Sequence, residues 1–237
     1  MSLLPWLNPE DDFPPAETAL SDPNGLLAAG ADLSPERLLT AYRNGIFPWS
    51  SGDQPLLWWS PDPRCVVFPA KVHISRSLKK AIRKHSYTIS FDQCFEEVIE
   101  HCARGEEYTG GWITEEMKAA YASLADKGIA HSVEVWRNGN LVGGLYGIGI
   151  GCCFFGESMF SLESNASKVA FAALCKQAER WQFPVIDCQI ENEHLSSLGA
   201  ELITRDRFQS LIQTGMKNNN LFTWHFDEDI IEQILAS

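Results

Sequence analysis

The chain has 237 residues, of which 45% are apolar and 21% charged, a composition typical of a globular protein with one large domain or two small ones. Its net charge of −12, from 31 acidic and 19 basic residues, argues against a protein that coats polyanions through its overall charge. Any contact with nucleic acid must therefore come from a local basic patch. Because no apolar run approaches the roughly 18 residues of a membrane span and the N-terminus lacks the basic segment of a signal peptide, we expect a cytoplasmic protein without a membrane partner.

Proline divides the chain into two parts. Eleven of the twelve prolines lie at or before Pro69, which predicts a loop-rich N-terminal region with few regular elements. One helix is expected there, over residues 35–44, because a serine cap and a proline in the first turn mark its start. We place a domain boundary in the rigid segment 58–64. This gives a small N-terminal domain at residues 1–62 and a larger domain at residues 63–237.

After Pro69, helical and strand patterns alternate, which predicts an α+β or α/β layered domain with helices and strands on one core. Helices are expected over residues 75–84, 92–104 and 114–127, and from about residues 164 and 206. Strands are expected over residues 133–136, 141–150, 152–157, 184–190 and 201–204.

The seven cysteines form no C-x-x-C pair, and most of them lie in apolar or strand-like segments. Free buried thiols are therefore expected rather than disulfides. A zinc site built from Cys94, His101 and Cys102 is a weaker alternative, because their spacing matches no familiar pair of zinc ligands.

A basic stripe stands out against the acidic chain. Six of the nineteen basic residues fall in the segment 71–84, and four of them are spaced i, i+3, i+4 and i+7, so they share one face of the expected helix. Like charges on one face repel each other, and a phosphate-bearing partner would relieve that repulsion. Both a solvated helix face and a phosphate-binding surface fit the pattern. The six residues are Lys71, Arg76, Lys79, Lys80, Arg83 and Lys84.

The expected strand near residue 145 carries a row of glycines on one face. Strand alternation places there Gly143, Leu145, Gly147, Gly149 and Gly151. Glycine weakens the interior of a strand, so such a row indicates close approach by something else. Either a bulky neighbour of the protein packs against this face, or the backbone forms the floor of a ligand cavity with Leu145 as its apolar contact.

Asp187 and Gln189 lie two residues apart on the expected strand 184–190, so strand alternation places them on one face, with Cα atoms roughly 6.5 Å apart. A carboxylate in so apolar a strand needs a partner, because its desolvation is costly. Asp187 therefore either pairs with a basic side chain or loop backbone, or forms a site with Gln189 at the strand end. His194, in the polar run that follows, is a further candidate base, although a histidine in a surface loop is more often solvated.

Several blocks, in order along the chain, carry a resemblance to a known family. They are GIFPW at 45–49, WWSPDPR at 58–64, HSVEVW at 131–136, FFGESMFS at 154–161, NASK at 165–168 and IDCQ at 186–189. With Trp112-Ile113 and the residues Asn192, His194 and Gly199, these blocks strongly resemble leucyl/phenylalanyl-tRNA–protein transferases.

This resemblance implies an α+β protein with a small N-terminal domain and a GNAT-like mixed-sheet domain. Such enzymes move Leu or Phe, and less well Met, from aminoacyl-tRNA to the N-terminal Arg or Lys of a protein, which is then degraded through the N-degron pathway. They need no metal and no coenzyme. We expect this chain to be a monomer.

The resemblance also implies site residues. Trp112, Phe154 and Met159 resemble the pocket for the Leu or Phe side chain, and the glycine-rich strand places Leu145 beside it. Glu157 and Asn192 are candidates to bind the N-terminal end of the acceptor peptide.

Asp187 is expected to orient the incoming amine and accept its proton, while Gln189 holds the amine or the ester carbonyl. The alternative leaves proton transfer to the terminal 2′-hydroxyl of the tRNA. Trp49 is expected to stack on the terminal adenine, and the basic stripe to bind phosphates of the acceptor stem.

Two other function classes would each explain part of the sequence. A coenzyme-A-dependent N-acetyltransferase would need a pyrophosphate-binding turn, and the segment 156–168 offers one glycine. A non-catalytic RNA-binding module would explain the basic stripe but not the pairing of Asp187 with Gln189 or the glycine-rich strand. The sequence contains no phosphate-binding loop and no dinucleotide-binding motif.

Overall fold

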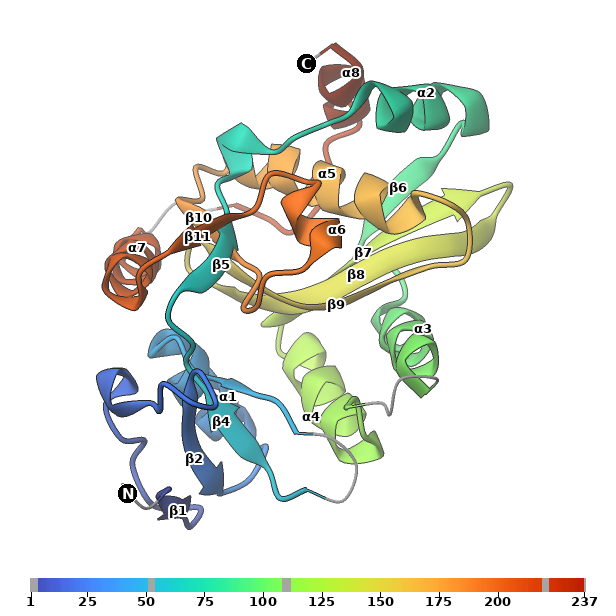
Figure 1. The fold of residues 1–237 in the computed structure, drawn as a ribbon. Helices are drawn as coiled ribbons and strands as arrows, with labels where there is room; N and C mark the ends of the chain where they lie inside the picture. The colour runs from blue at the N-terminus through green and yellow to red at the C-terminus, as the bar shows by residue number, and fades with distance from the viewer. Residues whose placement is uncertain (1–3, 51–53, 108–111, 219–221, 237) are drawn as a thin grey trace.

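The structure, a computed structural model, describes residues 4–50, 54–107, 112–218 and 222–236. Among these residues, a small sheet of four strands forms near the N-terminus (Figure 1). In spatial order its strands are β1 (Trp6–Leu7), β2 (Leu26–Gly30), β4 (Leu57–Trp59) and β3 (Phe47–Pro48), with β1 parallel to β2. The 3₁₀ helix η1 (Ala16–Thr18) precedes β2, and α1 (Pro35–Arg43) follows it, which confirms the predicted helix. The strands were not predicted, because two to five residues between prolines are too few for a visible alternation.

Within the described ranges, the second sheet has seven strands of mixed direction. Their spatial order is β11 (Glu201–Ile203), β5 (Arg64–Val67), β10 (Val185–Asp187), β9 (Cys153–Ser161), β8 (Asn140–Ile150), β7 (Ala130–Arg137) and β6 (Thr88–Phe91). The pair β9 and β10 is parallel, and the other neighbours are antiparallel. The chain is therefore α+β, with a small N-terminal sheet and a larger mixed sheet, as predicted.

Helices cover both faces of this sheet. Figure 1 shows α5 over one face, with α2 and α8 beyond it, and α3 and α4 on the other face. The bounds are η2 (Pro69–Lys71), α2 (Arg76–His85), α3 (Phe95–Glu107), α4 (Glu115–Asp126), α5 (Ala166–Arg180), α6 (Glu193–Ser196), α7 (Arg205–Lys217) and α8 (Ile230–Ala236). The hydroxyls of Ser75 and Thr114 accept hydrogen bonds from backbone N–H groups in the first turns of α2 and α4, which fixes where these helices begin. The helix expected over 92–104 begins later, since β6 and a turn precede it, and α8 was not predicted.

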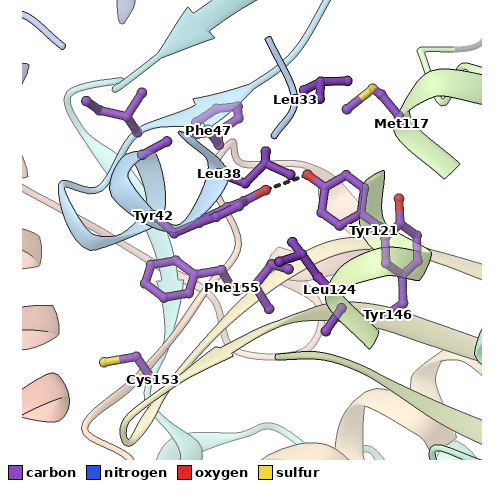
Figure 2. Packing of buried hydrophobic residues seen from close by; sticks show 14 of the residues in the cluster. Leu33, Leu38, Tyr42, Phe47, Met117, Tyr121, Leu124, Tyr146, Cys153 and Phe155 are labelled. Carbon is purple, nitrogen blue, oxygen red and sulfur yellow. Dashed lines mark hydrogen bonds between the residues drawn. The ribbon is translucent and has the colours of Figure 1, made fainter. Parts of the chain in front are cut away.

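The N-terminal domain shares a hydrophobic core with the larger domain. Figure 2 shows Tyr42 and Phe47 beside Tyr121 of α4 and Phe155 of β9. Tyr42, Tyr121 and Phe155 are fully buried, and the rings of Tyr42 and Phe155 lie 5.3 Å apart. The interface therefore consists of core side chains from both parts of the chain.

The glycine-rich face of β8 is filled by the protein itself. A Cβ atom on Gly143 would lie 2.4 Å from the Cβ of Ala166, and one on Gly149 would lie 2.8 Å from the ring of Trp224. A Cβ on Gly151 would lie 2.8 Å from the backbone of Met216. The glycines allow these neighbours to approach the sheet, so the interpretation of this face as the floor of a ligand cavity was wrong.

The seven cysteines, all within the described ranges, are free thiols, as predicted. The zinc alternative finds no support: His101 stacks on Phe160 with ring centroids 4.7 Å apart, and no three metal-ligating side chains among the described residues could hold an ion. In the same ranges, no helix is both long enough and apolar enough to cross a membrane.

Candidate active site

A cleft of about 850 Å³ opens where two parallel strands separate. β10 pairs with β9 only as far as Asp187, which lies opposite Phe155, whereas β9 continues along β8 to Ser161. The sheet splits beyond this point, and side chains from both strand ends line the cleft. Concave sites with apolar walls and a few polar groups are typical of small-molecule binding.

The apolar walls bring together all four residues predicted for the aminoacyl pocket. Trp112, Leu145, Phe154 and Met159 line the cleft. Sequence reasoning missed two further members of the wall, Phe171 and Leu174, which α5 contributes. Their apolar spacing predicted a helix but did not show which side chains reach a cavity.

Asp187 is buried, with 1% of its surface exposed, and is paired with a basic side chain. Arg64 of β5 donates from Nε to Oδ1 at 2.8 Å and from Nη2 to Oδ2 at 2.7 Å. The backbone N–H of Gln189 donates to Oδ1 at 3.1 Å. Of the alternatives left open by the sequence, the structure contains the ion pair, and Asp187 also fixes the backbone of Gln189 at the edge of the cleft.

Gln189 does not lie on the strand. β10 ends at Asp187, and Gln189 has a φ of +54°, the left-handed conformation that side chains other than glycine seldom adopt. The prediction that strand alternation places the two side chains on one face was therefore wrong. Gln189 reaches the cleft because the backbone turns after Asp187.

Glu157 is the extra residue of a β-bulge in β9. Across the strands, Gly147 pairs with Gly156 and Tyr146 pairs with Ser158, so Glu157 lies between two successive pairs. Bulges re-aim side chains and occur often beside active sites.

The carboxyl of Glu157 is held by three side chains from different elements. The hydroxyl of Tyr42 of α1 donates to Oε1 at 2.7 Å, the hydroxyl of Tyr121 of α4 lies 2.8 Å from Oε2, and the Nε2 of Gln189 lies 3.2 Å from Oε1. Burial raises the pKa of Glu157 to about 8, and the nearby charge of Asp187 acts in the same direction. The two tyrosines were not predicted, because a tyrosine on an apolar helix face looks like core packing.

The remaining predicted site residues lie around the rim. Trp49, 39% exposed, lines the cleft and packs against Trp59 with ring centroids 5.5 Å apart. Asn192 also lines the cleft, and its Oδ1 accepts a hydrogen bond from the backbone of Leu195 and thereby caps α6. His194 lines the cleft as well, and burial lowers its pKa.

Five of the six residues of the basic stripe lie on α2, and Lys71 ends the 3₁₀ helix η2 before it. None of its six residues is among those that line the cleft in the part of the chain that the structure describes. Lys71 pairs with Glu201 at 2.8 Å, and Arg83 donates to the backbone oxygen of Leu235 at 3.1 Å. Lys80 and Lys84 are exposed on the helix surface.

Replacement of Gly147 by alanine tests how closely the strands and Phe154 pack at the cleft wall. A Cβ on this residue would lie 2.2 Å from the backbone oxygen of Phe155 and 2.6 Å from the ring of Phe154, so Gly147→Ala is expected to lower the free energy of unfolding by about 2–3 kcal/mol. Gly156, its partner across the strands, is the control, because its Cβ would meet no atom closer than 3.4 Å. Denaturant unfolding of both alanine variants measures the difference. Equal stability of the two variants would contradict this packing.

Comparison with known proteins places these residues in a family. A family model described as leucyl/phenylalanyl-tRNA protein transferase matches residues 66–213, and a model of the N-terminal domain of that transferase matches residues 31–62. The leucyl/phenylalanyl-tRNA–protein transferase of Pseudomonas fluorescens (strain SBW25) is 54% identical over 224 residues, which cover 94% of this chain and 99% of the relative. That of Hahella chejuensis (strain KCTC 2396) is 51% identical over 230 residues, which cover 97% of this chain and 98% of the relative.

Similarity to solved structures is weaker. L-PGS from Bacillus licheniformis has a TM-score of 0.40 at 10% identity, with 68% of this chain and 55% of that chain covered. A ribosomal-protein-alanine N-acetyltransferase from Brucella melitensis biovar Abortus 2308 has a TM-score of 0.34 at 13% identity, with 58% of this chain and 96% of that chain covered.

Proposed function

The chain belongs to the leucyl/phenylalanyl-tRNA–protein transferase family, and from that premise we propose that its cleft moves Leu or Phe, and less well Met, from aminoacyl-tRNA to the N-terminal Arg or Lys of a protein. It is an aminoacyltransferase with an aminoacyl-tRNA donor and a protein acceptor. The transferred residue marks the acceptor for degradation through the N-degron pathway. The observation that carries the proposal is that an apolar pocket and the Gln189 amide meet in one cleft, where β9 and β10 separate.

The pocket for the side chain of the donor is assigned to Trp112, Leu145, Phe154 and Met159. An apolar pocket discriminates poorly by size, since one methylene group is worth only about 1–3 kcal/mol. Acceptance of Leu, Phe and Met by one site is therefore expected.

Positioning supplies most of the catalysis in this proposal. The α-amine of the acceptor has an ordinary pKa near 8, so a substantial fraction of it is uncharged and nucleophilic at neutral pH. Holding the amine beside the ester can lower the barrier by about 7–11 kcal/mol. Gln189, fixed through its backbone by Asp187, is assigned to hold the amine or the ester carbonyl. The proposed reaction uses no metal and no coenzyme.

The contacts of Asp187 favour one of the two proposed routes for the proton. Both of its carboxylate oxygens accept hydrogen bonds from Arg64, and Oδ1 also accepts one from the backbone of Gln189. We therefore assign Asp187 to positioning and the proton transfer to the terminal 2′-hydroxyl of the tRNA. Asp187 as the proton acceptor is the alternative, and a donor tRNA that lacks the terminal 2′-hydroxyl separates the two.

The acidic rim of the cleft supports a cationic acceptor. Glu191 and Glu193 line the cleft on either side of Asn192, and in the described ranges no lysine or arginine lines it. Glu157 and Asn192 are assigned to the end of the acceptor peptide, Glu157 through its contact with Gln189. An N-terminal Arg or Lys thus meets a site of complementary charge.

The tRNA is assigned to Trp49 and the basic stripe. Trp49 lies exposed at the cleft, where its ring can stack on the terminal adenine, a contact worth roughly 1–3 kcal/mol. The acceptor stem would then run to the exposed cations of α2.

Removing two cations of the stripe is expected to weaken tRNA binding in a salt-dependent way. Lys80→Ala with Lys84→Ala should reduce affinity at low salt and lower the slope of log affinity against log salt by roughly 1 for each phosphate that is no longer neutralised. Titration of charged tRNA at several salt concentrations measures both. Lys217→Ala, on α7, is the control for removal of a single exposed cation. An unchanged slope for the double variant would remove α2 from the tRNA site.

Transfer of labelled Leu or Phe from charged tRNA to an Arg-initiated peptide tests the function as a whole. Product is expected with the free N-terminus and not with the same peptide acetylated at its N-terminus. A titration with acetyl-coenzyme A tests the acetyltransferase alternative, and tRNA binding without transfer would favour the RNA-binding module. We further propose that the protein is cytoplasmic and monomeric, and light scattering tests the monomer. The proposed domain boundary lies between residues 62 and 63, and limited proteolysis tests it.

A further inference from the structure

If the carboxyl of Glu157 is ionised, the neighbouring hydroxyl groups carry fewer hydrogen atoms than their short oxygen–oxygen contacts require. Three oxygen–oxygen contacts join the two hydroxyls and the carboxyl to one another: the Tyr42 hydroxyl lies 2.5 Å from that of Tyr121 and 2.7 Å from Oε1, and the Tyr121 hydroxyl lies 2.8 Å from Oε2. Each phenol carries one hydrogen, so two hydrogens would serve three contacts. Two oxygens 2.5 Å apart with no hydrogen between them repel each other. A proton on the carboxyl completes the set.

The same count fixes the amide of Gln189. Its Nε2 lies 3.2 Å from Oε1 of Glu157 and supplies its own hydrogen for that contact. If the amide were reversed, two acceptor oxygens would face each other and a fourth shared hydrogen would be needed. The nitrogen therefore faces Glu157, and the carbonyl oxygen of the planar amide lies on the other side.

We propose that Glu157 holds a proton in the resting protein and forms, with Tyr42 and Tyr121, a closed ring of hydrogen bonds that orients Gln189 so that its carbonyl oxygen accepts a hydrogen bond from the acceptor α-amine. In this ring Oε2 donates to Tyr121, Tyr121 donates to Tyr42, and Tyr42 donates to Oε1. The three residues are positioning residues, which act through Gln189. The part that concerns the amine rests on the proposed function; the protonation of Glu157 does not.

The surroundings of Glu157 agree with a neutral carboxyl. The groups that face it are Tyr42 from α1, Tyr121 from α4, Asp187 from β10 and Arg64 from β5. Burial is the largest influence and raises the pKa of Glu157 to about 8; Asp187 raises it further, while the tyrosine hydrogen bonds and Arg64 lower it. Burial also raises the pKa of both phenols well above 10, so they keep their hydrogens.

Stability against pH tests the proton without any substrate. The carboxyl binds its proton more tightly in the folded than in the unfolded chain, where its pKa is about 4.3, so its stabilising contribution is complete below that pH and is lost as the pH rises to about 8. Glu157→Gln keeps one acceptor and supplies a donor to Tyr121 at every pH, so it is expected to gain stability relative to the wild type between pH 5 and 8, with no further gain above. A difference that stays constant from pH 5 to 9 would overturn the protonated ring.

Kinetics test the positioning role. Glu157→Gln should be at least about tenfold faster in kcat than Glu157→Ala at pH 7, and Tyr121→Phe should lower kcat about tenfold with little change in the KM for tRNA. The ratio of Glu157→Gln to wild-type rate should rise above pH 8, where the wild-type ring loses its proton. Tyr87→Phe is the matched control, because Tyr87 also contacts a carboxylate, that of Glu163 at 3.4 Å, but lies outside the cleft lining.

The outcomes separate the ring from the function. If Glu157→Gln and Glu157→Ala are equally slow in an active wild-type background, the orienting role is wrong. If the wild type transfers no amino acid at all, the proposed function fails, and the stability measurement still decides whether Glu157 holds a proton.

Discussion

Replacement of Arg64 by methionine is expected to lower the free energy of unfolding by about 3–5 kcal/mol, because it leaves the carboxylate of Asp187 buried without its cation. Arg64 is fully buried, and its guanidinium does more than pair with Asp187. Its Nη1 donates to the backbone oxygen of Gly45 at 3.0 Å, and its Cζ lies 4.7 Å from the ring centroid of Phe47 and 4.6 Å from that of Phe208. One side chain thus joins the N-terminal domain, β10 and α7.

Denaturant unfolding of the wild type and Arg64→Met gives the difference directly. Arg137→Met is the matched control: its ion pair with Glu163, at 2.9 Å, is 37% and 30% exposed, and a decrease below about 1 kcal/mol is expected. The double variant Arg64→Met with Asp187→Leu should recover part of the stability, since it removes the buried charge. A decrease below about 1 kcal/mol for Arg64→Met alone would contradict the buried pair.

Removal of the 2′-hydroxyl from the terminal adenosine of the donor tRNA is expected to slow transfer by about 10²–10⁴-fold, the usual range for removal of a group that moves a proton in the transition state. The reason is the state of Asp187, whose oxygens are already bonded to Arg64 and to the backbone of Gln189. No such decrease is expected if Asp187 takes the proton.

Single-turnover transfer at saturating donor and acceptor measures this effect apart from binding. A tRNA that lacks the 2′-hydroxyl of the preceding nucleotide is the control, since it carries the same change one position away from the ester. A decrease of less than about fivefold with the terminal deoxyadenosine would return the proton to Asp187 or to another group of the protein.

The sequence predicted those site residues whose type is unusual for their surroundings, such as a charged residue in an apolar strand. A carboxylate in an apolar strand indicated that Asp187 needed a partner, but not which one, since Arg64 is 123 residues away. An arginine in the equally apolar segment 64–67 was the matching signal, because each charge needs a partner once it is buried. Tyr42 and Tyr121 gave no such signal, because a tyrosine side chain can pack in an apolar core or form a hydrogen bond to a carboxyl group.

The fold followed the same rule. Long elements with caps or clear periodicity were predicted best: β8 was predicted to within one residue at each end and the start of α5 to within two, whereas β7 begins three residues before its predicted start. β5, β6 and the strands of the N-terminal domain have at most five residues, and pairing with distant strands rather than local pattern makes them strands. The glycine row of β8 fitted two interpretations equally, because a missing side chain does not say what fills its place.

The common core of the two sheets has a thermodynamic consequence. Tyr42 and Phe47 come from before the expected boundary at residue 62, yet they pack on Tyr121, Phe155 and Arg64 from after it. The two parts should therefore melt together in one cooperative transition rather than as independent folding units. A fragment that begins after this boundary would lack Tyr42 and Phe47 and would expose the side chains of Tyr121, Phe155 and Arg64 to water.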